Sequence, residues 1–185
     1  MACKINSAIA LDCIDSLGGI REVYVGTDVD LGIVRYNSIG EITGLPYITG
    51  TFYKYELPKD TASFTETFNI SNTNGSAFYD QAITINLHKL NAFKRKQLLL
   101  LSKNRNIKVI LQDNNLNYWL IGKDDGAILS AGTSVTGTAV GDANQYSLTI
   151  SAQEKKMAPR IRNISIVFSP ANPGVPGEGG EFLTP

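Results

Sequence analysis

The sequence predicts a mainly β fold: an antiparallel β-barrel or β-sandwich with one packed α-helix and a long β-hairpin. Three observations favour this fold class. Two long segments, residues 63–71 and 77–88, alternate with a period of two, which is typical of half-buried strands, and many short strand signals surround them. Only residues 89–103 carry a convincing helical apolar stripe. Strands and helices do not alternate along the chain, which argues against a doubly wound α/β fold.

The first part of the chain contains mostly short strand signals. Residues 20–26 (IREVYVG) form a good strand, and shorter strands are expected near Ile33 and Ile42. Residues 51–57 (TFYKYEL) form a further strand that ends at Pro58.

The strongest feature is a long hairpin. Residues 63–71 and 77–88 both show period-two patterning, and residues 72–75 (NTNG) supply a turn whose Asn-Gly pair tolerates positive φ. These arms exceed the length of an average strand, which is about five or six residues. The hairpin therefore indicates a sheet that reaches beyond a single domain or wraps a barrel.

Residues 89–103 form the one predicted helix. Asn91 is its expected N-cap, Asn104 fits its exit, and Lys103 complements the negative end of the helix dipole. The basic run at residues 94–96 (KRK) is expected to be solvated. The predicted core residues of the helix are Leu90, Phe93, Leu98 and Leu101.

After the helix, β patterning returns. Strands are expected at residues 107–113 and 118–122, in the AILSAG segment, at residues 146–154 and at residues 160–168. We therefore predict a single β domain over residues 1–168. Residues 169–185 are rich in Pro and Gly and are predicted to form a C-terminal tail that cannot pack as an element alone.

The charge balance limits the classes of function. The chain has 17 Lys and Arg and 17 Asp and Glu, so its formal net charge is zero. This balance argues against a nucleic-acid binder of the basic-patch kind. Because a protein free in solution usually keeps a net charge, neutrality favours a protein that lives in an assembly.

Few residues could support catalysis or metal binding. The single histidine, His88, falls at a strand end, and Cys3 and Cys13 lack CxxC spacing. This cysteine count indicates folding in a reducing cytoplasm. No GxSxG or P-loop motif occurs, and the Asp-rich turns lack the spacing of a calcium loop. No apolar run approaches a membrane span or the apolar core of a signal peptide. We expect a non-enzymatic, unexported protein without cofactor, metal or membrane partner.

The order of elements resembles that of bacteriophage tail tube proteins. The resemblance is carried by SFTETFNISNTNGSAFYDQAITINLH (hairpin), LNAFKRKQLLLLSKN (helix), IKVILQDNNLNYWLIGKDDGAILSAG (strand pair) and TGTAVGDANQYSLTISAQE (closing strands), over about residues 51–154. It implies a hexameric ring whose inner wall is a continuous β-barrel built from every copy, and rings that stack into a conduit for DNA. It also implies a virion location in the phage tail, assembly in the host cytoplasm, and other tail proteins as partners.

A conduit must not bind its cargo. Lys and Arg bind duplex DNA by releasing its counterions, so we expect an acidic or neutral lumen through which DNA passes without specific binding. The predicted lumen-facing residues are Thr65, Glu66, Thr67, Asn69, Ser71, Asp80, Thr84 and Asn86. The apolar residues predicted to face the helix are Phe64, Phe68, Ile83, Ile85 and Leu87. Because Glu66 and Phe68 have the same parity, this assignment requires a bulge or twist.

Two other kinds of function remain open at the level of sequence. The chain is equally compatible with a connector, a tube terminator or a hub ring of the same tail. It is also compatible with a carbohydrate-binding β-sandwich in which Trp119 stacks on sugar rings, although the apolar neighbours of Trp119 favour a core position.

Overall fold

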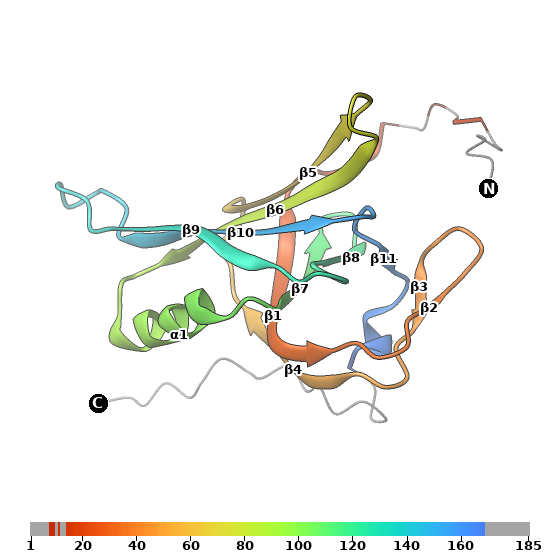
Figure 1. The fold of residues 1–185 in the computed structure, drawn as a ribbon. Coiled ribbons are helices and arrows are strands. Elements are labelled where there is room, and N and C mark those ends of the chain that lie inside the picture. The colour runs from red at the N-terminus through yellow and green to blue at the C-terminus, as the bar shows by residue number, and fades with distance from the viewer. Residues whose placement is uncertain (1–7, 10, 12–13, 169–185) are drawn as a thin grey trace.

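The computed structural model describes residues 8, 9, 11 and 14–168. These residues form two β-sheets and one α-helix, with no closed barrel (Figure 1). Of the two predicted architectures, the β-sandwich with one helix is therefore the one observed. Cys3, Cys13 and the predicted tail at residues 169–185 lie outside the described residues.

The larger sheet has seven strands in the order β2-β3-β11-β8-β7-β1-β4. Its strands are β1 (Ile20–Asp30), β2 (Arg35–Tyr36), β3 (Ile42–Gly44), β4 (Thr49–Tyr55), β7 (Ile107–Asp113), β8 (Tyr118–Ile121) and β11 (Arg160–Ile161). Its central strands are covered on both faces, which explains why β7 reads as a nearly continuous apolar run. Val109 points into one core and Ile110 into the other.

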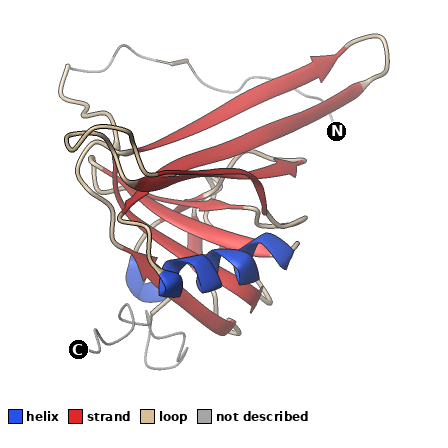
Figure 2. Ribbon diagram, turned by 90° about the vertical axis from the view of Figure 1, so that its left-hand side faces the viewer, coloured by secondary structure: helices blue, strands red, loops and turns tan. Residues whose placement is uncertain are grey.

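The smaller sheet has four strands in the order β5-β6-β10-β9. Its strands are β5 (Ala62–Ser71), β6 (Ser76–His88), β9 (Ile128–Val135) and β10 (Gln145–Glu154). The predicted hairpin is confirmed as β5 and β6. It crosses the top of the molecule, and its end projects from the body (Figures 1 and 2).

The main core lies between the two sheets. Ile83 and Ile85 of β6 and Ile150 of β10 pack there with Val109 of β7 and Val25 of β1. Each of these side chains is buried, because alternate residues of every strand point to the same face. The sandwich thus leaves the other face of the four-stranded sheet outside the core.

Helix α1 (Ala92–Lys103) follows β6 and begins later than predicted. Asn91 is the N-cap, as predicted, and its side chain accepts a hydrogen bond from Lys94 N at 2.7 Å. Because the helix starts at Ala92, Leu90 precedes it, although Leu90 still packs against the core. Leu98 and Leu101 are buried, whereas Phe93 is 59% exposed. The prediction of Phe93 as a core residue is therefore wrong: at 100° per residue it lies about 140° around the helix from Leu98.

The expected strand at residues 160–168 is also wrong for most of its length. Only the two residues of β11 pair with neighbours, and a short 3-10 helix follows at Ile164–Ile166. Asn163 starts this turn, because its side chain accepts a hydrogen bond from Ser165 N at 3.0 Å. Phe168 then packs on Tyr24 and Phe52, with ring centroids at 5.2 and 6.4 Å.

Candidate functional site

The outer face of the four-stranded sheet is the candidate site. It is mostly polar, with Phe78, Ile128 and Val135 as exposed apolar members, and it is free of Lys and Arg. The strands β5, β6, β9 and β10, all described in full, contain no Lys and no Arg. Their only acidic residues are Glu66, Asp80 and Glu154. All 17 Lys and Arg of the chain therefore lie outside this sheet.

Seven of the eight predicted lumen residues share this outer face. In an antiparallel pair, residues directly opposite each other point the same way. The pairs Thr65–Ala82, Thr67–Asp80 and Ser63–Thr84 therefore define one face. The residues placed on it from the predicted set are Thr65, Thr67, Asn69, Ser71, Asp80, Thr84 and Asn86.

Glu66 is the exception, and its placement on this face is wrong. The register of β5 with β6 runs from Ala62 to Ser71 without a shift, so no bulge separates Glu66 from Phe68. Strand alternation then sends Glu66 to the inner face, opposite Gln81. Phe68 is on the same side but 54% exposed, so it does not pack against the helix as predicted.

β10 also contributes to the outer face, and none of its residues is among the predicted lumen residues. Ser147, Thr149 and Ser151 lie opposite Asn86, Thr84 and Ala82. The hydroxyl oxygens of Thr84 and Thr149 are 3.5 Å apart. The alternation YSLTIS in β10 was the available signal, since its small polar residues occupy every second position.

Beneath this face, a buried polar network joins the two sheets. Gln81 Nε2 donates to Glu66 Oε1 at 3.1 Å and to the Lys156 carbonyl at 3.3 Å. Gly122 N donates to Gln81 Oε1 at 3.2 Å, which connects β6 to the end of β8. Ala158 N donates to Glu66 Oε1 at 2.7 Å. Glu66 is therefore a structural acceptor.

Glu154 ends β10 on the same inner side. Its Oε1 accepts hydrogen bonds from Asp124 N and Asp125 N at 3.0 and 3.1 Å. Burial raises the pKa of the Glu154 carboxyl despite these two bonds, and the charges of Asp124 and Asp125 raise it further. Burial also lowers the pKa of the nearby Lys108 amine, whose Nζ donates to the Lys123 carbonyl at 3.1 Å.

The four-stranded sheet has two edges without a partner strand in the chain's described part. β5 pairs only with β6, and β9 pairs only with β10. Neither edge strand contains Lys, Arg or Pro, the residues with which many proteins block edge pairing. All three strand pairs are antiparallel, so β5 and β9 run in opposite directions.

The hairpin extends beyond the sheet as a two-stranded end. Pairing with β10 stops at Tyr79, so Ser76–Phe78 are held only by β5 (Figure 2). Phe68 and Tyr79 stack edge to face there, with ring centroids 5.2 Å apart. A two-stranded hairpin alone is marginally stable in water. This end therefore presents apolar surface that the described residues do not cover.

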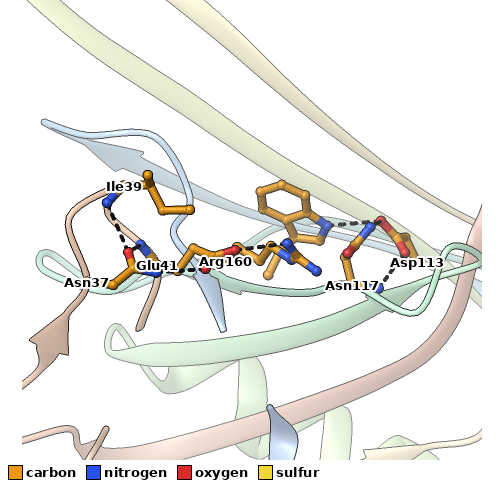
Figure 3. Close-up of polar contacts among 7 residues, drawn as sticks. Asn37, Ile39, Glu41, Asp113, Asn117 and Arg160 are labelled. Carbon is orange, nitrogen blue, oxygen red and sulfur yellow. Dashed lines mark hydrogen bonds and ion pairs between the residues drawn. The ribbon is translucent and has the colours of Figure 1, made fainter. Parts of the chain in front are cut away.

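A cavity of about 420 Å³ lies beside β11 and is lined by Tyr36, Trp119, Met157 and Arg160, among others. At its margin, Arg160 Nη1 binds Glu41 Oε1 at 2.8 Å (Figure 3). Trp119 packs against the main core, and its Nε1 donates to Asp113 Oδ2 at 3.2 Å. The indole is thus partly engaged within the protein, in agreement with the core position that the sequence favours.

The described residues contain no group of three or more His, Cys, Asp or Glu side chains placed to hold a metal ion. Among these residues, no helix has the length and apolar character needed to cross a bilayer.

Comparison with known proteins adds no identification. The chain matches no protein-family model, and its sequence matches no curated protein.

Proposed function

We propose that this chain is a structural subunit of a bacteriophage tail. In this proposal its copies close into a hexameric ring, and the rings stack into the tube that conducts DNA. Other tail proteins are its further partners, the host cytoplasm is its place of assembly, and the virion is its destination. The absence of Lys and Arg from the four-stranded sheet is the observation that carries the proposal.

The edges of the four-stranded sheet support ring closure. Because β5 and β9 run in opposite directions, rotating a copy about an axis beside the sheet brings its β9 antiparallel to the β5 of its neighbour. Closure removes both exposed edges of the four-stranded sheet. Barrels of 16–18 strands already leave an aqueous channel, so six copies of a four-stranded sheet enclose a wider one.

The outer face supports a wall that lets DNA slide. Each Lys or Arg in such a wall would bind a phosphate and release a counterion. Threonine, serine and asparagine hydroxyls and amides are neutral, and Asp80 is the only charged side chain that the four strands place on this face. A mostly polar lining whose only charge is acidic hydrates the channel without attracting the duplex.

Negative-stain electron microscopy of the purified protein over a range of concentrations tests the proposal. Filaments support a tube subunit, and isolated rings support a connector, terminator or hub ring of the same tail. A chain that stays monomeric at high concentration contradicts the proposal.

A substitution at the β9 bulge sharpens this test. Ser130 is skipped in the register between Thr149 and Ile150, and a bulge on an edge strand is a place where folded sheets accommodate proline, which also blocks the addition of a further strand. We expect Ser130→Pro to abolish rings while the folded monomer remains. Ser130→Ala is the matched control, because it loses the same side-chain hydrogen bond to Thr149 and keeps the N–H.

A further inference from the structure

Two exposed apolar patches lie at opposite ends of β6. The tip patch consists of Phe68, Ile70 and Tyr79 on the inner side of the projecting hairpin. The helix patch consists of Phe93, Lys96, Leu99, Leu100 and Lys103 on α1. Nine residues of β6, from Asp80 to His88, separate Tyr79 from the segment that leads into α1, which corresponds to about 30 Å of extended strand. The tip patch of one copy therefore cannot cover the helix patch of the same copy.

The helix patch is a continuous surface turned away from the core. At 100° per residue its five side chains fall within an arc of about 120°, nearly opposite Leu98 and Leu101. Phe93, Leu99 and Leu100 are 59%, 56% and 55% exposed. Three large apolar side chains gathered on one solvent-facing helix arc are typical of an interaction surface.

The tip patch is also exposed to solvent. Ile70 is 70% exposed and Phe68 is 54% exposed, and no strand of the described chain lies beside them except β5 and β6. In Figure 2 this end of the hairpin stands clear of the body. Its two strands gain stability from any surface that covers the inner side.

The charges of the two regions are complementary. Residues 89–105, which include α1, contain six Lys and Arg and no Asp or Glu. Residues 62–88, which include the hairpin, contain no Lys or Arg, and their two acidic residues are Glu66, on the inner side with the tip patch, and Asp80, on the outer face. Opposite charge steers two surfaces together and selects the correct partner.

We propose that the tip patch of one copy docks on the helix patch of another copy. This proposal rests on the proposed ring, and it names the contact by which one ring joins the next. The two patches differ, so the contact is heterologous, and it propagates along one direction. Because the two patches lie at the two ends of β6, rings add along the direction of this strand, which runs out of the plane of the ring.

Two substitutions break one side of the contact each. Ile70→Asp places a charge in the tip patch and leaves the helix patch intact, and Phe93→Asp does the reverse. Both side chains are exposed, so the fold is expected to persist, which circular dichroism checks. Ile33→Asp is the matched control, because Ile33 is 62% exposed and lies in neither patch. We expect single rings from each patch variant and filaments from the control.

Mixing the two variants as separately purified rings gives the decisive result. The Ile70→Asp ring keeps its helix patches, and the Phe93→Asp ring keeps its tip patches, so the two rings can join once. The patches left at the outer ends of the pair are the substituted ones, so no third ring can add. Electron microscopy should therefore show stacks of two rings and no longer filaments. Substituting Lys96→Glu with Lys103→Glu should shorten wild-type filaments several-fold through the lost charge complementarity.

Filaments of wild-type length from both Ile70→Asp and Phe93→Asp would overturn the contact while leaving the ring proposal standing. Single rings alone in the mixture would also overturn it, since the two patches would then not be each other's partners. A wild-type chain that forms no rings contradicts the proposed function itself, and the contact with it.

Discussion

At the scale of single residues, the two sheets are joined by a few buried polar side chains. Gln81, 1% exposed, uses both ends of its amide: it donates to Glu66 and accepts from Gly122. Its neighbours along β6 are ordinary strand residues, so nothing in the alternating pattern distinguishes Gln81 as a bridge. The network depends on the register of β5 with β6, which places Gln81 opposite Glu66.

Removing the Gln81 amide should destabilise the protein. Gln81→Leu leaves the Glu66 carboxylate and the Gly122 N–H without this partner, and a buried polar group left unpaired costs about 1–3 kcal/mol. Urea unfolding measures the loss. Gln153→Leu, on an exposed position of β10, is the control and should change stability by less than about 0.5 kcal/mol. Equal effects of the two substitutions would contradict a bridging role for Gln81.

Glu154 should contribute a distinctive pH dependence. Burial raises the pKa of this carboxyl in the folded state, so the folded protein binds the proton more tightly than the unfolded chain does. Its contribution to stability is therefore full below the ordinary pKa of glutamate and is lost as pH rises through the raised pKa. Asp124, Asp125 and Lys108 are the charged groups around it.

Glu154→Gln keeps an oxygen that can accept the two backbone N–H groups, but it does not titrate. We expect this variant to be at least as stable as the wild type at pH 7. The loss of stability with rising pH that Glu154 causes in the wild type should be absent from the variant. Thermal unfolding followed between pH 4 and 8 measures both. An unchanged pH profile would show that Glu154 is not the group responsible. Burial opposes the ionisation of Glu22, but Lys54 and Tyr24 outweigh it and lower the pKa of this carboxyl. The stability that Glu22 contributes is therefore lost as pH falls, in the wild type and in the variant alike.

At the scale of elements, the sequence pattern predicts the long strands well and the short ones poorly. β5, β6, β7 and β10 alternate, or run apolar, over enough residues for the period to be read. β2 and β11 have two residues each, which is too few for any period, and tertiary pairing alone defines them. The predicted strand over residues 160–168 failed for this reason.

The helix shows that tertiary packing decides which side of a leucine-rich segment is buried. Four consecutive leucines, Leu98–Leu101, allow several choices of apolar stripe. Packing against the main core buries Leu98 and Leu101, and the other two face solvent. Lys89 and Leu90 are held before the helix by hydrogen bonds to Asn144, a residue far along the chain whose role no local pattern reveals.

Adjacent leucines of this helix should respond differently to truncation. Leu101→Ala removes a buried side chain and should cost about 2–5 kcal/mol. Leu100→Ala removes an exposed one and should change monomer stability by less than about 0.5 kcal/mol. Chemical denaturation of the two variants, side by side, measures the difference. Similar losses would mean that the helix packs with a different face.

At the scale of the whole molecule, charge is divided between the two sheets. Every Lys and Arg is excluded from the four-stranded sheet, and net neutrality hides this division when the composition is read as a whole. The division could have been counted from the sequence strand by strand. The strand order that brings two separate hairpins into one sheet could not, because it depends on the pairing of β6 with β10.

Adding charge to the outer face should convert a passive wall into one that binds DNA. Thr65→Lys with Thr133→Lys adds two exposed lysines per copy to this face. Assembled variant protein should bind labelled duplex DNA, with an affinity that falls steeply with salt, by about 0.9 log units per tenfold salt for each phosphate contact. Fluorescence anisotropy over a salt series measures this.

Ser38→Lys with Ser102→Lys adds the same charge at exposed positions outside the sheet and is the control. If both double variants bind DNA alike, the outer face has no special access to the duplex, and its role as the channel wall is contradicted.

The division of charge has a practical consequence for proteolysis. Trypsin cuts only after Lys and Arg, so its nearest sites around the β5–β6 hairpin are Lys59 and Lys89, and those around the β9–β10 hairpin are Lys123 and Lys155. A complete digest therefore releases each hairpin as a single long peptide. A host enzyme of trypsin's specificity can nick the scaffold around this sheet, but it has no cleavage site within any of the sheet's strands.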